Sequence, residues 1–193
     1  MVPFDYPANP PIPVDFTITK GRLSLILGDL TVYDARGDRV FSVDRRRLKS
    51  ADAAHTKALV DSAGNPLITL HFDIIILQGG WKGFRGNSLE SKDLIFRVQT
   101  TVHSRLRTEM EVFLMGENGE GQKPDLIIKG SPYKRSCTIY MGSSIIAQTS
   151  LMYKLGKIIY GRRKFRLTVY PGADHVLVVA LLVVFFQTKI IML

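Results

Sequence analysis

Clusters of arginine and lysine are the residues of this chain best suited to chemistry. One cluster lies at positions 45–49, another at 162–166, and a smaller pair at 134–135. The candidate residues are Arg45, Arg46, Arg47, Lys49, Lys134, Arg135, Arg162, Arg163, Lys164 and Arg166. A multiply charged phosphate group needs several converging donors, which guanidinium and ammonium groups supply. With a net charge of +9, the chain favours anionic partners such as phospholipid headgroups or nucleic acid. For each cluster, a solvated turn is the alternative.

Other residue types form no recognisable catalytic or metal site in the sequence. The four histidines, His55, His71, His103 and His175, are scattered without the spacing of metal ligands. No nucleophile elbow, phosphate loop or HExxH motif occurs. We therefore expect a protein that is not an enzyme and that carries neither a cofactor nor a metal.

Two weaker candidates each have a structural alternative. Arg135 lies two residues before Cys137 and could lower the pKa of its thiol, whereas burial in a strand would leave the cysteine inert. The loop around residues 116–123 offers oxygen ligands for Ca²⁺ but does not match the order or length of an EF-hand. Its oxygen-bearing residues are Glu117, Asn118, Glu120 and Asp125. We expect a buried structural cysteine and a solvated hairpin loop.

The elements that must position these side chains are strands. Apolar and polar residues alternate with a period of two over residues 23–44 and 57–73. Both segments contain an aspartate followed three residues later by glycine, Asp34 with Gly37 and Asp61 with Gly64. Aspartate favours turn entry and glycine adopts positive φ, so both pairs predict hairpin tips of two copies of one unit. The adhesion-like tripeptide at 36–38 falls in the first tip, where we expect turn chemistry.

About a dozen short strands are predicted in all. Beyond the two repeated units, we expect strands at 73–77, 93–100, 108–115, 125–129, 136–141, 144–148, 157–160 and 165–170. Turns are expected at Gly79-Gly80, Gly86-Asn87, 116–123, Gly142 and Gly161. Short strands at regular spacing favour an all-β barrel or sandwich.

The apolar run at 176–186 predicts the chain's main helix. Tyr170-Pro171-Gly172 ends the preceding strand, and Asp174 is placed to cap the first N–H groups. Eleven helical residues span about 16 Å, whereas the hydrocarbon core of a bilayer is about 30 Å thick. A core helix is therefore favoured over a membrane anchor. A helix that is apolar on every side must be surrounded, and threading it through a barrel buries both apolar surfaces.

One barrel domain accounts for most of the 193 residues. Residues 1–19 are proline-rich and predict an extended arm, residues 20–193 a single domain, and about 174–186 its central helix. The N-terminus lacks the basic and apolar regions of a signal peptide, and a lone cysteine permits no internal disulfide. We therefore expect a protein that is not secreted and is cytoplasmic, peripheral at a membrane, or nuclear. We also expect a monomer.

Several sequence blocks resemble one plant family. The most specific are FRG with DLIF at 84–96, RSCTIY at 135–140, and VYPG before Asp174 and the apolar run. In these blocks the chain resembles the LURP-one-related proteins (DUF567) over about residues 28–186. The resemblance implies a tubby-like fold of about twelve strands around a central C-terminal helix. It also implies kinship with tubby C-terminal domains and phospholipid scramblases. The apolar end FFQTKIIML departs from the family, whose members usually leave the helix into a polar tail.

Three functions follow as hypotheses from this resemblance. The first is a non-enzymatic module that tethers to membranes by binding phosphoinositide headgroups, and charge reversal at Arg162, Arg163 and Lys164 would abolish that binding. The second is a regulatory factor that binds a protein partner, with a role in plant pathogen defence. Nucleic acid ranks below both because the basic runs are short and poor in aromatics. The third, lipid scrambling, would require the helix to insert in a membrane, which the barrel forbids.

Overall fold

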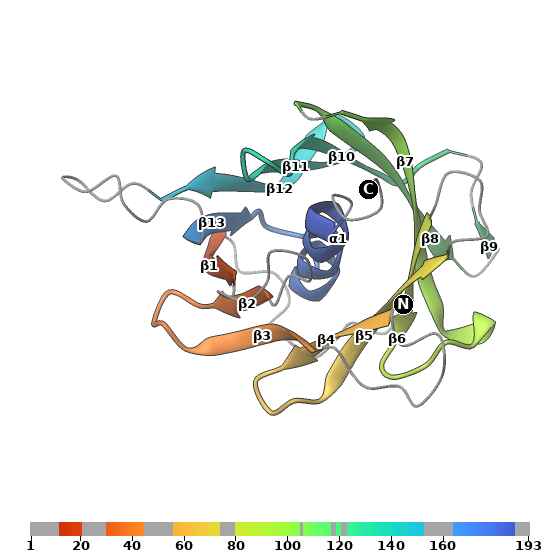
Figure 1. Cartoon of the computed structure of the whole chain (residues 1–193), viewed down its shortest axis with the longest axis horizontal. Coiled ribbons are helices and arrows are strands. Elements are labelled where there is room, and N and C mark those ends of the chain that lie inside the picture. The colour runs from red at the N-terminus through yellow and green to blue at the C-terminus, as the bar shows by residue number, and fades with distance from the viewer. Residues whose placement is uncertain are drawn as a thin grey trace.

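The structure, a computed structural model, describes residues 12–20, 30–44, 56–73, 80–104, 106–116, 119–120, 123–152 and 164–187. Within these residues, twelve antiparallel strands close into a barrel around one C-terminal helix (Figure 1). Sheet order follows chain order from β1 to β8, and β10 closes the ring by pairing with both β8 and β11. The short β9 pairs with β8 outside the ring. The predicted barrel with a central helix is confirmed.

The strands have the following bounds: β1 (Val14–Lys20), β2 (Leu30–Tyr33), β3 (Arg39–Asp44), β4 (Thr56–Asp61), β5 (Pro66–Asp73), β6 (Gly80–Arg85), β7 (Leu94–His103), β8 (Thr108–Gly116), β9 (Gly119–Glu120), β10 (Leu126–Ser131), β11 (Ser136–Met141), β12 (Ser144–Leu151) and β13 (Lys164–Val169). A 3₁₀ turn, η2 (Ser91–Asp93), precedes β7, and the α-helix is α1 (His175–Gln187).

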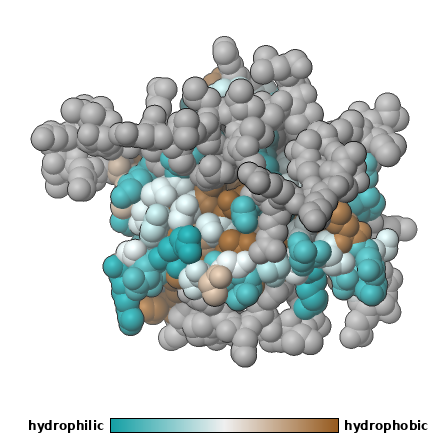
Figure 2. Space-filling model, turned by 60° about the horizontal axis from the view of Figure 1, so that its bottom comes forward, coloured by the Kyte–Doolittle hydropathy of each residue, from teal (hydrophilic) through white to brown (hydrophobic). Residues whose placement is uncertain are grey.

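Alternation along each strand sorts side chains between the barrel interior and the outside. Phe16 and Ile18 of β1 are buried, as are Phe165, Leu167 and Val169 of β13. The residues between them face outward and are mostly polar. On the face drawn in Figure 2, hydrophilic residues lie beside smaller apolar patches. The period of two seen in the sequence therefore follows from the barrel wall.

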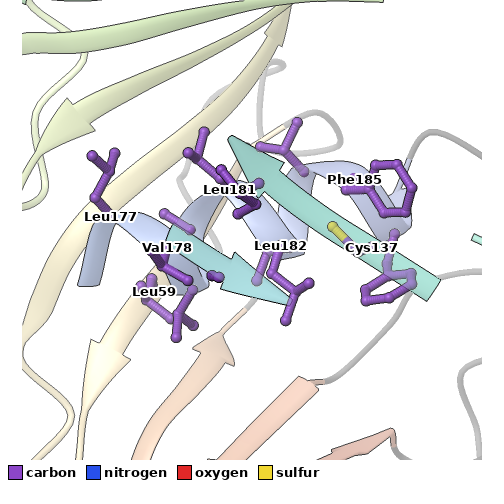
Figure 3. Close-up of a cluster of buried hydrophobic side chains, with 14 of the residues drawn as sticks. Leu59, Cys137, Leu177, Val178, Leu181, Leu182 and Phe185 are labelled. Atoms are coloured by element: carbon purple, nitrogen blue, oxygen red, sulfur yellow. The ribbon is translucent and has the colours of Figure 1, made fainter. Parts of the chain in front are cut away.

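Helix α1 fills the barrel, and all thirteen of its residues are buried. Figure 3 shows Leu59 of β4 and Cys137 of β11 among side chains from the length of the helix. Among the described residues, no helix combines the length and the apolar character needed to cross a bilayer. Because every residue of α1 is buried inside the barrel, the apolar run is the axis of the core.

Asp174 begins the helix as predicted. Its Oδ1 accepts hydrogen bonds from the backbone N–H groups of Val176 (2.8 Å) and Leu177 (3.0 Å). Its carbonyl accepts the first helical hydrogen bond, from Val178. Gly172 has φ +87°, a conformation that lets the chain turn sharply from β13 into the barrel.

Both predicted hairpin tips are confirmed. Gly37 and Gly64 have φ values of +90° and +88°, and each donates its N–H to the carbonyl of the aspartate three residues before it. The Asp34 carboxylate accepts from the N–H groups of Arg36 and Asp38, and Asp61 accepts from Asn65. The tripeptide at 36–38 is therefore part of a turn.

Two strands were wrongly predicted. Residues 14–19, assigned to the arm, form most of β1, so the barrel begins at Val14 instead of residue 20. The strand β6 was missed because two of its six residues are glycine, which weakens strand propensity. Gly83 is paired with Phe96 of β7, and a Cβ atom at Gly83 would lie 2.3 Å from the Phe96 ring. The glycine therefore makes room for an aromatic side chain in the core.

Some expectations lie outside the described residues. These are the arm up to residue 11, the strands expected at 23–27, 74–77 and 157–160, the turn at Gly161, and the departing end at 188–193.

Replacing Asp174 with alanine should destabilise the fold by about 1 kcal/mol, because two N–H groups at a buried helix end lose their acceptor. Chemical denaturation of both proteins measures the difference. Asp174→Asn is the matched control and should stay near wild type, since asparagine caps as well as aspartate. Equal losses in both variants would contradict the capping role.

Candidate functional site

One end of the barrel gathers several of the cations. β1 ends at Lys20 where β13 begins, and Thr19 is paired with Lys164. The hairpin between β10 and β11 turns at this same end, and it carries Lys134 and Arg135. Helix α1 also ends here, at Gln187. We term this end, with Lys20, Lys134, Arg135 and Lys164, the basic mouth.

A small recess opens at the basic mouth, over the end of the helix, and it has room for about one water molecule. Its lining residues are Lys20, Leu30, Arg135, Phe165, Phe186 and Gln187. Lys20 continues the inward-facing series of Phe16 and Ile18, and Arg135 continues that of Cys137 and Ile139. On β1 and β11, the series of inward-facing side chains therefore ends in a cation at the mouth. No carboxylate is found among the described residues that line the recess.

Arg135 is held in an unusual backbone conformation. Its φ is +58°, and it is the only non-glycine residue with positive φ in the described part of the chain. Its carbonyl accepts a hydrogen bond from the Thr149 hydroxyl at 2.8 Å, and its guanidinium carbon lies 5.7 Å from the centre of the Phe186 ring. A left-handed conformation costs an L-residue about 1–2 kcal/mol, so glycine would be the easier residue here. The strain at this position marks a candidate functional residue.

Lys20 lies in an environment that opposes its charge. Burial lowers the pKa of its ammonium group, and the nearby positive charge of Arg135 lowers it further. Below that lowered pKa, the folded protein therefore holds two like charges together in a partly dry recess. A bound anion would reduce the repulsion between the two cations, so the arrangement is suited to binding an anionic group.

Asp44 lies at this end, where β3 ends, and two further carboxylates near it are paired with cations. Asp73 accepts from Lys82 at 2.8 Å. Glu109 pairs with Arg107 and lies 3.8 Å from Lys129, and the hydrogen bond from Arg107 lowers the pKa of the Glu109 carboxyl. At the other end of the barrel, the turns carry Asp34 and Asp61 and the helix begins at Asp174. Cations therefore predominate at the basic mouth, whereas carboxylates lie together with Arg36 and Arg39 at the other end.

The predicted basic candidates separate into three groups. Lys134, Arg135 and Lys164 come together at the basic mouth. Arg166 lies on the outer face of β13, where it pairs with Asp15 at 3.5 Å in an exposed ion pair. The remaining candidates, Arg45, Arg46, Arg47, Lys49, Arg162 and Arg163, lie outside the described residues.

Lys20 is the functional candidate that the sequence prediction missed. It was hidden because the proline-rich composition of the first residues was extended too far into the chain. The alternation in FTITK, with Phe16 and Ile18 facing inward, was the signal that could have placed Lys20 at the rim of the interior.

Cys137 is a buried structural residue. It is 2% exposed, and burial raises the pKa of its thiol well above the usual range. The alternative of a thiol activated by Arg135 is therefore wrong.

No cluster of three or more histidine, cysteine or acidic residues within the described chain could hold a metal ion. His71 is hydrogen-bonded to Thr56, and His175 packs edge-on against Phe16 with ring centres 5.4 Å apart. In the loop considered for Ca²⁺, Asp125 accepts a hydrogen bond from the Leu114 N–H at 2.8 Å. Glu117 and Asn118 lie outside the described residues.

Comparisons with known proteins show the family of this chain and agree with its fold. The family model for LURP-one-related proteins matches residues 14–186, and the chain belongs to this family. Protein LURP-one-related 7 of Arabidopsis thaliana is 43% identical over 178 residues, which cover 91% of this chain and 90% of the relative. Protein LURP-one-related 15 of the same plant is 31% identical, with 90% of this chain and 79% of the relative covered. A crystal structure of an Arabidopsis thaliana protein matches with a TM-score of 0.66 and 29% identity, covering 94% of this chain and 93% of that chain.

Replacing Lys20 with methionine should raise the melting temperature at neutral pH, because it removes a partly desolvated charge that Arg135 repels. Between the lowered pKa and the ordinary value of 10.5, the unfolded chain binds more protons than the folded one. Wild-type stability should therefore rise with pH across that window, and the advantage of Lys20→Met should shrink. Thermal unfolding at several pH values measures both effects.

Lys164→Met is the matched control, since Lys164 is exposed at the start of β13. It should leave the melting temperature nearly unchanged. A lower melting temperature for Lys20→Met at neutral pH would show that Lys20 stabilises the fold, for instance by bonding the last carbonyls of α1, and would contradict the account of the recess.

Proposed function

We propose that this protein is a non-enzymatic module that binds the headgroups of anionic phospholipids, phosphoinositides above all, and thereby tethers to membranes as a peripheral protein. The observation that carries the proposal is the recess in which Lys20 and Arg135 face the same space at the barrel mouth. A phosphorylated headgroup is the ligand class that such a pair fits, because phosphate accepts several charge-assisted hydrogen bonds at once.

The surroundings of the recess support the same ligand. Leu30, Phe165 and Phe186 line it beside the cations, and Gln187 is only 4% exposed there. Electrostatic interactions are stronger against such apolar walls than in open water. Lys134 and Lys164 on the rim add charges that an anionic membrane surface attracts, at about 1 kcal/mol for each basic residue near the surface.

Family membership sets the context of this proposal. The resemblance noted in the sequence connects the fold with tubby domains and scramblases, and it supports membrane tethering by analogy of fold. A role in plant defence rests on that same resemblance. A regulatory function through a protein partner is the alternative, and the experiment below distinguishes the two.

The test is flotation of detergent-free protein with phosphatidylcholine vesicles, with and without a phosphoinositide, at low and high salt. We expect binding that requires the phosphoinositide and disappears at high salt, because exposed charges are screened. Arg135→Gln and Lys20→Met should each weaken binding about fivefold, the equivalent of one lost surface charge.

Arg36→Gln is the matched control, because it removes one exposed cation from the turn at the other end of the barrel. It should bind like wild type. Folded protein that does not float with any vesicle would overturn the proposal and favour a protein partner. Salt-resistant binding to neutral vesicles would also contradict it.

A further inference from the structure

The basic mouth also exposes large apolar side chains. Leu106, in the turn between β7 and β8, is 71% exposed, and Tyr133, in the turn between β10 and β11, is 52% exposed. Leu151 and Met152, at the end of β12, are each 37% exposed. Large apolar groups that lie together in water mark an interaction site more reliably than isolated ones.

These side chains belong to neighbouring elements. Gly130 is paired with Thr108, so the turn after β10 lies beside the turn before β8. β11 is paired with β12, and Leu151 is paired with Phe165. Leu106, Tyr133, Leu151 and Met152 thus follow one another along the rim, and we term them the apolar rim.

The two turns that carry the most exposed residues are held by their own hydrogen bonds. Arg107 donates its N–H to the Ser104 hydroxyl, which in turn donates to the Arg107 carbonyl, both at 3.0 Å. In the other turn, the Lys134 N–H donates to the Ser131 carbonyl at 3.1 Å. Leu106 and Tyr133 therefore lie beside residues that these hydrogen bonds hold in place, which lowers the entropy lost on binding.

Cations alternate with the apolar rim. Arg107, which is paired with Glu109, follows Leu106, and Lys134 and Arg135 follow Tyr133. An interfacial segment needs this combination, because apolar and aromatic groups enter the headgroup region while lysine and arginine remain at anionic headgroups.

We propose that the apolar rim enters the interfacial region of an anionic phospholipid bilayer, with the barrel axis directed at the membrane and the end of α1 nearest to it. This inference rests on the proposed function and adds an orientation to it. Bound in this way, the recess with Lys20 and Arg135 would face the headgroup layer while Leu106 and Tyr133 reach below it.

Charge selects this end of the barrel over the other. The opposite end also exposes apolar residues, Met141 at 50% and Ile145 at 41%. Its two Asp–Gly turns, however, carry Asp34, Asp38 and Asp61 against the cations Arg36 and Arg39, so carboxylates outnumber cations there and an anionic surface is repelled. Met141 therefore provides a matched position that should remain in water.

The test uses single cysteine substitutions labelled with a polarity-sensitive fluorophore. The native Cys137 is 2% exposed with a raised thiol pKa, so labelling of Leu106→Cys, Tyr133→Cys and Met141→Cys should be selective for the new cysteine, and unmodified protein is the labelling control. With vesicles of phosphatidylcholine and phosphoinositide, we expect a blue shift at positions 106 and 133 and none at 141. Vesicles of phosphatidylcholine alone should shift none of the three.

Flotation of the same labelled samples separates the two levels of the proposal. Binding with a shift at 141 alone, or with no shift at any position, would overturn the orientation and leave headgroup binding intact. No binding by wild-type or labelled protein would overturn both. As a label-free measurement, the double change Leu106→Ser with Tyr133→Ser should lower vesicle affinity about tenfold, and Met141→Ser should not change it.

Discussion

The structure depends on the reciprocal burial of one apolar helix and the interior of one barrel. Neither surface is stable in water alone, because α1 is apolar on every side and twelve strands direct their apolar side chains toward it. Each large side chain that becomes fully buried contributes roughly 1.5–3 kcal/mol before the loss of conformational entropy. The helix is thus the principal hydrophobic element of the fold, although it is the last element described in the chain.

This constraint also explains where polar chemistry is found. The helix occupies the barrel interior, so inward-facing polar groups that must reach water are restricted to the two mouths. At one mouth Asp174 caps the start of the helix, and at the other the interior series end in Lys20 and Arg135. The positive end of the helix dipole therefore meets a carboxylate, and the negative end meets cations. The helix dipole favours the charged form of Lys20, whereas burial and the positive charge of Arg135 disfavour it. An anionic ligand would stabilise that charged form.

The sequence predicted those parts of the fold that depend on local chemistry. The Asp–Gly turns, the cap at Asp174 and the apolar helix each have a physical signal within a few residues, and the structure confirms them. The basic mouth could be predicted only in part, because Lys20, Arg135 and Lys164 are distant in the chain and meet through strand register. β6 was not predicted because Gly83 lowers its strand propensity. That glycine is needed to leave space for the Phe96 ring on the neighbouring strand, and the sequence of β6 alone does not show this. The conformation of Arg135 was equally hidden, since a positive φ is expected of glycine or asparagine.

Native-state hydrogen exchange tests the central claim of reciprocal burial most directly. If helix and barrel stabilise each other as one unit, the amides of Leu181 and Leu182 in α1 should exchange only through global unfolding. Their opening free energies should then equal those of core strand amides such as Ile128 in β10, within about 1 kcal/mol. Exchange of the helix amides through a smaller opening, while the strands remain protected, would show that the barrel persists without its helix and would contradict the account.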